Sequence, residues 1–84
     1  MTTETLAQIG PRTAGAIYQN SDGAFEVLAL VTDPAEAARL LNRRPEAARF
    51  AVIVKDVLRP NGEPFVVGSV WTSSDRLVRA GGAS

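Results

Sequence analysis

The residue types that most often carry catalysis or bind metal ions are missing from this chain of 84 residues. It contains no His and no Cys, which excludes the usual zinc sites, Ser-His triads and Cys nucleophiles. It also lacks a glycine-rich phosphate loop, a G-x-G-x-x-G motif and a Ca²⁺ loop with alternating acids. We therefore expect a protein that is not an enzyme and has no catalytic residue, metal or cofactor.

Lys55 and Ser69 form the one arrangement that keeps a catalytic hypothesis open. If residues 50–72 form a hairpin with Arg59 opposite Glu63, Lys55 and Ser69 become diagonal neighbours on one face. A lysine with a lowered pKa can activate a serine hydroxyl. We favour the ordinary alternative, in which Lys55 extends to solvent at a sheet edge and Ser69 is a small interface residue.

A basic segment at residues 39–49 supports a different hypothesis, binding to nucleic acid. Its net charge is +3, since four arginines face only Glu46, and it can follow a phosphate backbone while an exposed Trp71 stacks on bases. Against this, the whole chain is neutral and has no nucleic-acid-binding motif. Arginines near a helix C-terminus usually interact with the helix dipole and solvent. The candidate contact residues are Arg39, Arg43, Arg44 and Arg49.

Size and composition favour one small domain that associates with another chain. With 45% hydrophobic and 21% charged residues, the chain is expected to fold, although so short a chain buries only about 60% of its unfolded surface. Without Cys it has no disulfides, which leaves regular packing or oligomerisation as the stabilising devices. One base and five acids in residues 1–38 give −4, and eight bases and four acids in residues 39–84 give +4. Such asymmetry indicates an anionic partner or complementarity within the assembly.

The elements that must position these side chains begin with a hairpin. Residues 14–19 and 24–31 are typical of strands, and the Asn, Ser, Asp and Gly between them are typical of a turn. If Asp22 and Gly23 form a two-residue turn, Tyr18 faces Val27 and shares a side with Phe25.

A helix start at Asp33 is the most specific local signal. Asp33 suits the N-cap, Pro34 the first helical position, and Glu36 the position three residues after the cap. An apolar stripe of Ala37, Leu40 and Leu41 follows, and Pro45 ends the helix or begins a separate turn.

A second hairpin spans residues 50–72. A two-residue turn at Asn61 and Gly62 would place Pro60 in the closing pair, where it has no N–H to donate. A type I turn with Gly62 in a bulge avoids this and sets Arg59 opposite Glu63. Both faces are then mostly apolar, although one short helix covers only one of them. The candidate interface residues are Ile53, Val57, Phe65, Val67 and Trp71.

The two ends of the chain carry weaker signals. We expect a flexible N-terminal arm or an edge-strand extension at residues 1–13, a single domain at residues 14–79 and a disordered tail at residues 80–84. Asp75 and the two preceding serines are typical of a cap for a helical turn. No secretory signal or membrane span is present in the pattern, so we expect a cytoplasmic location without membrane contact.

These elements predict an α+β fold in ββαββ order: two β-hairpins flanking one central helix, with a mainly antiparallel four-stranded sheet. How the second strand meets the third, and which hairpin face the helix covers, stay open. The preferred function is a non-enzymatic homodimeric protein-interaction module, with a different protein as a possible partner. The alternative is a small nucleic-acid-binding regulator that uses residues 39–49. The Ala- and Arg-rich, Lys-poor composition is typical of a GC-rich bacterial genome.

Overall fold

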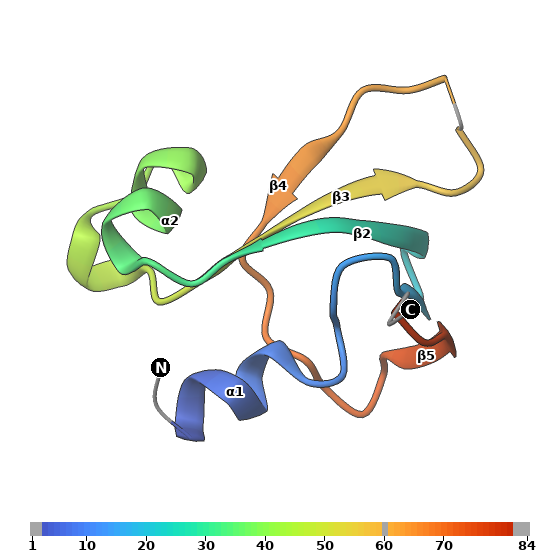
Figure 1. Cartoon of the computed structure of the whole chain (residues 1–84), viewed down its shortest axis with the longest axis horizontal. Coiled ribbons are helices and arrows are strands. Elements are labelled where there is room, and N and C mark those ends of the chain that lie inside the picture. Colours follow the sequence, from blue (N-terminus) through green and yellow to red (C-terminus); the bar gives the residue numbers. More distant parts are fainter. Residues whose placement is uncertain (1–2, 60, 82–84) are drawn as a thin grey trace.

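Two α-helices and five strands are formed by the described part of the chain, residues 3–59 and 61–81 of a computed structural model (Figure 1). The α+β class and the antiparallel sheet predicted from the sequence are confirmed. The elements are α1 (Thr3–Ile9), β1 (Ile17–Asn20), β2 (Gly23–Val31), α2 (Pro34–Leu41), a 3₁₀ helix η1 (Pro45–Ala47), β3 (Ala51–Asp56), β4 (Phe65–Val67) and β5 (Arg76–Arg79).

The strands form one sheet in the order β4-β3-β2-β1-β5, with every neighbouring pair antiparallel. The predicted ββαββ succession runs from β1 to β4, but it describes the fold only roughly. A fifth strand, β5, is added beside β1, and α1 precedes the first hairpin. The two hairpins meet through β2 and β3, which form the central antiparallel pair.

The C-terminal segment corrects one local prediction. Residues 76–78, expected to form a helical turn after Asp75, belong to β5. The Asp75 carboxylate accepts hydrogen bonds from the Thr72 N–H at 2.9 Å and from the Asn20 side chain at 2.8 Å. These bonds close a turn and fasten it to β1, so the chain continues along the free edge of β1 rather than into a helix.

The first hairpin turns at Ser21 and Asp22, with Asn20 opposite Gly23 and Tyr18 opposite Phe25. This register differs by two positions from the predicted one, in which Tyr18 faced Val27. A shift of two leaves the side chains before the β2 bulge on their predicted faces, because successive residues alternate. Tyr18 and Val27 accordingly lie together in the core. Beyond the bulge between Val27 and Ala29 the faces are exchanged, so Leu30 packs with the main core and Val31 with the alanine cluster.

The second hairpin has a different register from the predicted one. Val54 pairs with Phe65 and Val52 with Val67, a shift of three positions. The hydrogen bond expected across the turn, from the Gly62 N–H to the Arg59 carbonyl, is present at 2.8 Å, but Gly62 is not left-handed. The β3–β4 pairing stops at Val54 and Phe65, and the Val57 N–H bonds to Ala24 of β2, so a long connection separates the two strands. An odd shift exchanges the faces of β4 relative to β3, so Phe65 and Val67 lie on the face of the fully buried Val52 and Val54. Pro60, on which the predicted turn was built, lies outside the described residues.

The helix start predicted at Asp33 is confirmed, with Pro34 as the first residue of α2. Asp33 has the extended backbone of an N-cap, but its side chain makes no capping hydrogen bond. Asn42, in the left-handed conformation at φ 56°, ends the helix. The helix then packs through alanines, in a cluster of Ala37, Ala38, Ala48 and Ala51.

The two helices pack against different parts of the sheet (Figure 1). On the side of α1 lies the main core, made of Ile9, Ala16, Tyr18, Val27, Phe50, Val52 and Val54. Helix α2 contacts the other face at one end only, where β2 ends and β3 begins.

The N-terminal segment contains a helix rather than the predicted edge-strand extension. Helix α1 buries Thr5 and Ile9 and ends at Gly10, whose φ is +66° and whose N–H bonds to the Leu6 carbonyl at 3.0 Å. The core therefore includes residues before the predicted domain start at residue 14. Of the predicted tail, residues 82–84 lie outside the described residues.

Arg12 is the unexpected member of this core, since it is only 2% exposed. Its Nε donates to the Ile9 carbonyl at 2.7 Å, and its Nη2 donates to the carbonyls of Gln8 and Ser69 at 2.9 and 2.8 Å. Its guanidinium lies 5.5–5.7 Å from the ring centres of Tyr18, Phe50 and Trp71. Arg12 thus joins the end of α1 to the segment after β4.

Candidate protein-interaction surface

The structure divides the five predicted interface residues among three places. Phe65 and Val67 share the face of Val52 and Val54, while Ile53 pairs with Val66 on the opposite face. Val57 follows the end of β3, and Trp71 packs against the main core. The register shift in the second hairpin is the reason, because it moves β4 side chains to the face opposite Ile53.

Trp71 is half-buried and belongs mainly to the interior. Its ring centre lies 5.8 Å from that of Tyr18 in an edge-on arrangement, and its backbone N–H bonds to the Gln8 carbonyl at 2.7 Å. The segment after β4 is thereby held against α1.

A part of the sheet surface stays free of both helices, on the face that carries α2 but at the opposite end. The pairing of Ile17 with Glu26, and of Glu26 with Lys55, sets these three residues on one face. A shallow hollow of about 170 Å³ lies here. We call this surface the open end: Ile17, Glu26, Leu28, Ile53, Lys55, Asp56, Val57 and Arg79.

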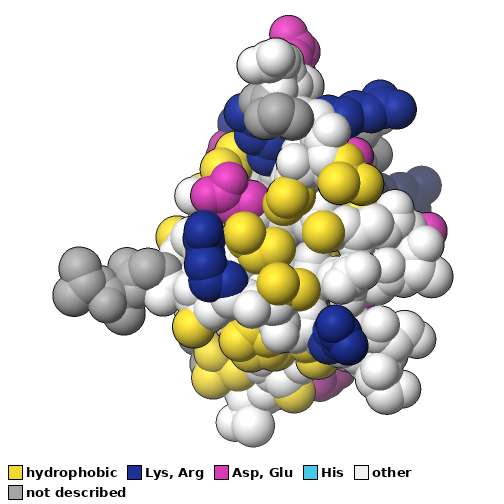
Figure 2. All heavy atoms as spheres, turned by 90° about the vertical axis from the view of Figure 1, so that its right-hand side faces the viewer, with side chains coloured by type: hydrophobic (Ala, Val, Ile, Leu, Met, Phe, Trp, Pro, Cys, Tyr) yellow, Lys and Arg dark blue, Asp and Glu magenta, His cyan; other side chains and the backbone are white. Residues whose placement is uncertain are grey.

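The centre of the open end is apolar. Leu28 and Val57 are 39% and 40% exposed, and Ile17 and Ile53 are half-buried. Figure 2 faces the end of the molecule at which β3 ends, and hydrophobic side chains gather across the middle of this view with charged ones around them. Contiguous apolar surface with a polar rim is typical of interaction sites.

The charges of the open end sum to zero. Arg79 lies 3.7 Å from Glu26 and also donates to the Gly15 carbonyl at 3.0 Å. Asp56 accepts the Leu58 N–H at 2.9 Å, and Lys55 is the second base. Two bases and two acids therefore surround the apolar centre.

Lys55 and Ser69, the pair considered for catalysis, lie apart. Lys55 is on the open end, beyond the last β3–β4 pair. Ser69 follows β4 at the other end of that pairing, where its carbonyl accepts from Arg12. The register shift removes the predicted diagonal contact.

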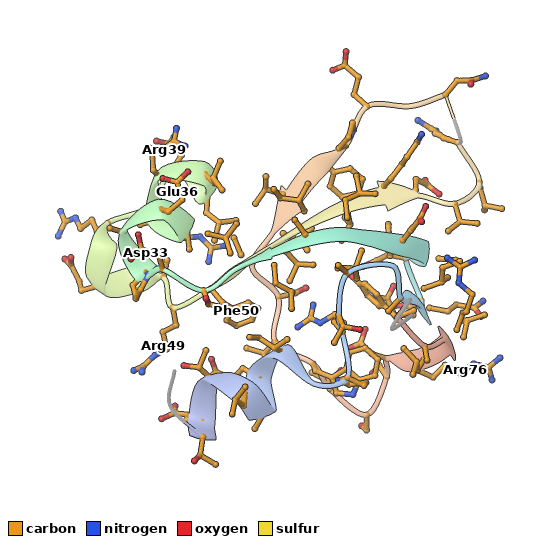
Figure 3. The ribbon with its side chains drawn as sticks, viewed as in Figure 1. Asp33, Glu36, Arg39, Arg49, Phe50 and Arg76 are labelled. Atoms are coloured by element: carbon orange, nitrogen blue, oxygen red, sulfur yellow. The ribbon has the colours of Figure 1, made fainter. Side chains whose placement is uncertain are left out.

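The four arginines of the basic segment do not gather on one surface. Arg39 pairs with Glu36 on α2, and this hydrogen bond lowers the pKa of Glu36 and raises the pKa of Arg39. Figure 3 shows Arg39 and Arg49 pointing to opposite sides of the α2 region. Arg44 is exposed, and Arg43 lies near Gly68.

Asp75 has the most developed hydrogen bonding of the described carboxylates. Burial by itself raises its pKa, but the bonds from Asn20 and from the Thr72 N–H and hydroxyl outweigh burial, so the pKa lies below its ordinary value of 3.8. The ionised form is therefore the one that stabilises the turn between the 72–75 segment and β1.

We expect the replacement Asp75→Asn to reduce the free energy of unfolding by about 1 kcal/mol at pH 6, the scale of a part-exposed charge-assisted hydrogen bond. Because the folded-state pKa is the lower one, the carboxylate contributes fully above the unfolded value near 3.8 and loses its contribution as the pH falls through the folded value. Urea unfolding from pH 2 to pH 7 measures this. The difference between the two proteins must shrink below pH 4, and a constant difference would contradict the assignment.

The sequence predicted Ile53 and Val57 as interface residues, but it did not assemble the open end, because that surface depends on pairing between distant strands. Arg79, for example, comes from β5, which was expected to be a helical turn. Leu28 lies at the irregularity between Val27 and Ala29, where β2 shifts register against β3. No local pattern marks such a bulge.

No protein-family model, no curated protein and no solved structure matches this chain. In residues 3–59 and 61–81, no three His, Cys, Asp or Glu side chains come together to hold a metal ion. None of the described helices is long and apolar enough to span a membrane.

Proposed function

We propose that this chain is a non-enzymatic protein-interaction module that forms a homodimer through the open end. The observation that supports it is the apolar centre formed by Ile17, Leu28, Ile53 and Val57, which neither helix covers. Burial of such a surface is favourable at about 25 cal/mol per Å².

The balance of charge around the open end favours a second copy as the partner. A two-fold dimer brings the same patch of both chains together, so that patch has to be complementary to itself. A surface of one charge would repel its own copy. In a two-fold arrangement Lys55 of each chain can approach Asp56 of the other, and the apolar centres meet between them.

The size of the chain is also consistent with a dimer. A standard interface buries about 800 Å² per partner, which is about one-seventh of the 5423 Å² surface. An 84-residue chain without disulfides is in the size range where association commonly adds stability. The basic segment supports no second proposal, because Arg39 is paired and points away from Arg49.

We expect Val57→Asp to raise the dimer dissociation constant at least about 100-fold, since a two-fold axis brings two added carboxylates together in an apolar contact. Sedimentation equilibrium over a range of protein concentrations measures the change. Val57 is partly exposed and follows β3, so the substitution leaves the core intact. Circular dichroism checks that the fold is retained.

Leu6→Asp is the matched control, because Leu6 is 51% exposed on α1, on the other side of the sheet. It is expected to leave the dissociation constant within about twofold. Equal weakening by both substitutions would contradict the open end as the interface. A wild-type chain that stays monomeric at every concentration would contradict the homodimer itself.

A further inference from the structure

The outer edge of β4 borders a groove separate from the open end. Val66 and Val67 are neighbours on a strand, so their side chains point to opposite faces, yet both line the same hollow together with Gly68 and Ser69. A hollow lined from both faces must pass along an edge of the strand. The inner edge of β4 pairs with β3, and β4 is the last strand of the sheet. The groove therefore follows the free edge.

Helix α2 forms the other wall of this groove through Leu40 and Leu41, both half-buried. The volume is about 540 Å³, which suits several side chains of an extended segment. A Cβ on Gly68 would lie 2.8 Å from Leu41 Cδ1 and 3.1 Å from an Arg43 guanidinium nitrogen. The missing side chain at Gly68 thus lets Leu41 and Arg43 approach the end of the strand closely and form the wall of the groove there.

Arg43 supplies a charge beside this apolar groove. It is exposed and lines the hollow. Ion pairs within the described residues join Arg39 to Glu36 and Arg79 to Glu26, and none of them involves Arg43. Asp22 also lines the hollow, and it shares a second hollow with Ser69. The rim therefore offers one cation that is free to take a carboxylate, and one anion.

We propose that this groove binds an extended peptide segment of another protein, which adds to the sheet as a strand beside β4. The free N–H and C=O groups of β4 provide backbone hydrogen bonds, and the groove against Leu40 and Leu41 takes an apolar side chain. Arg43 binds a carboxylate of the peptide, from an acidic side chain or a free C-terminus. This site is separate from the proposed dimer contact, because no residue of the open end lines the groove.

The test uses a library of random nine-residue peptides displayed with free C-termini, selected on the immobilised full chain. We expect the enriched peptides to combine an apolar residue with a nearby carboxylate. For a synthetic enriched peptide, fluorescence anisotropy should show binding about tenfold weaker to Arg43→Gln, the loss of one ion pair, and unchanged for the matched control Arg44→Gln. Asp22→Asn should leave the affinity unchanged or raise it, because it removes an anion from the rim.

Two further measurements separate strand addition from other modes of binding. Amide chemical shifts of the labelled protein should change most at residues 65–69 and 40–43. The same peptide N-methylated at alternate residues should lose binding in one of its two patterns, because only one set of its N–H groups faces β4.

The proposal is overturned if no peptide is enriched, if Arg43→Gln and Arg44→Gln bind equally, or if the shifts map to the open end. It is also overturned if Arg43→Gln dissociates the dimer, since a second copy would then occupy the groove. A monomeric wild-type chain that still binds the peptide at β4 would refute the homodimer and leave this site in place.

Discussion

Replacing Arg12 by Ala is expected to reduce the free energy of unfolding by at least about 4 kcal/mol. Ala has no donor for the carbonyls of Ile9, in a buried bond, and of Ser69, in a part-buried one. A buried carbonyl left unpaired costs about 1–3 kcal/mol, and a part-buried one costs less. The Gln8 carbonyl keeps its bond from the Trp71 N–H. The lost packing of the arginine stem and the lost contacts with three rings add to the cost.

One effect opposes this loss. A buried cation is costly to desolvate, and its removal relieves that cost. Here the carbonyls and ring faces already solvate the guanidinium, and they lose that partner when it is removed. The carbonyls left without a donor therefore outweigh the relieved desolvation cost, and the substitution lowers the free energy of unfolding. Because 84 residues correspond to about 4–13 kcal/mol in total, this loss is at least about a third of the free energy of unfolding.

Urea unfolding followed by circular dichroism and Trp71 fluorescence measures this effect. Arg12→Lys, which keeps the charge but reaches fewer carbonyls, should lie between the wild type and Arg12→Ala. Arg44→Ala, at an exposed position, should change the free energy of unfolding by less than about 0.5 kcal/mol. An Arg12→Ala protein as stable as Arg44→Ala would show that Arg12 does not hold α1 to the sheet.

Gly10→Ala is expected to cost about 3 kcal/mol. An Ala at φ +66° is strained by about 1–2 kcal/mol. Its Cβ would also lie 2.4 Å from Trp71 Cγ, so the indole must move, and overpacking of this kind costs about 1–3 kcal/mol. Since Trp71 contacts both Arg12 and Tyr18, its displacement loosens the same part of the core.

Gly23→Ala separates the two causes. Gly23 also has a positive φ, +139°, but its Cβ would meet only Phe25 Cζ at 3.8 Å, an ordinary contact. Both substitutions therefore strain the backbone, which chemical denaturation measures, but only Gly10→Ala should alter Trp71 emission. Unchanged emission in Gly10→Ala would mean that Trp71 does not pack against Gly10.

The parts of the fold that depend on neighbouring residues were predictable from the sequence. The start of α2 at Asp33 and Pro34 follows from backbone constraints within one turn. The first hairpin kept its predicted faces as far as Val27, because its register differs by an even number of positions, and the bulge after Val27 exchanged the faces of Leu30 and Val31. In the second hairpin the register differs by an odd number of positions, so Phe65 and Val67 lie on the face of Val52 and Val54 and not on that of Ile53.

Tertiary contacts explain what the sequence did not show. Nothing local marks Arg12 as a core residue, since its partners Tyr18, Phe50, Ser69 and Trp71 come from distant segments. The same holds for β5, whose four exposed residues join the sheet through pairing with β1. The apolar surplus of the second hairpin was recognised in advance. The position of these apolar residues on the open end follows only from the observed pairing of β3 with β2 and β4.

The central claim is that two copies associate through the open end, and contacts between copies test it most directly. A sample that mixes ¹³C-labelled and unlabelled chains gives nuclear Overhauser effects between copies only. The proposed dimer predicts such effects among the methyl groups of Ile17, Leu28, Ile53 and Val57. Their absence at a concentration where the chain is dimeric, or effects confined to methyl groups such as Leu6 and Val70, would contradict it.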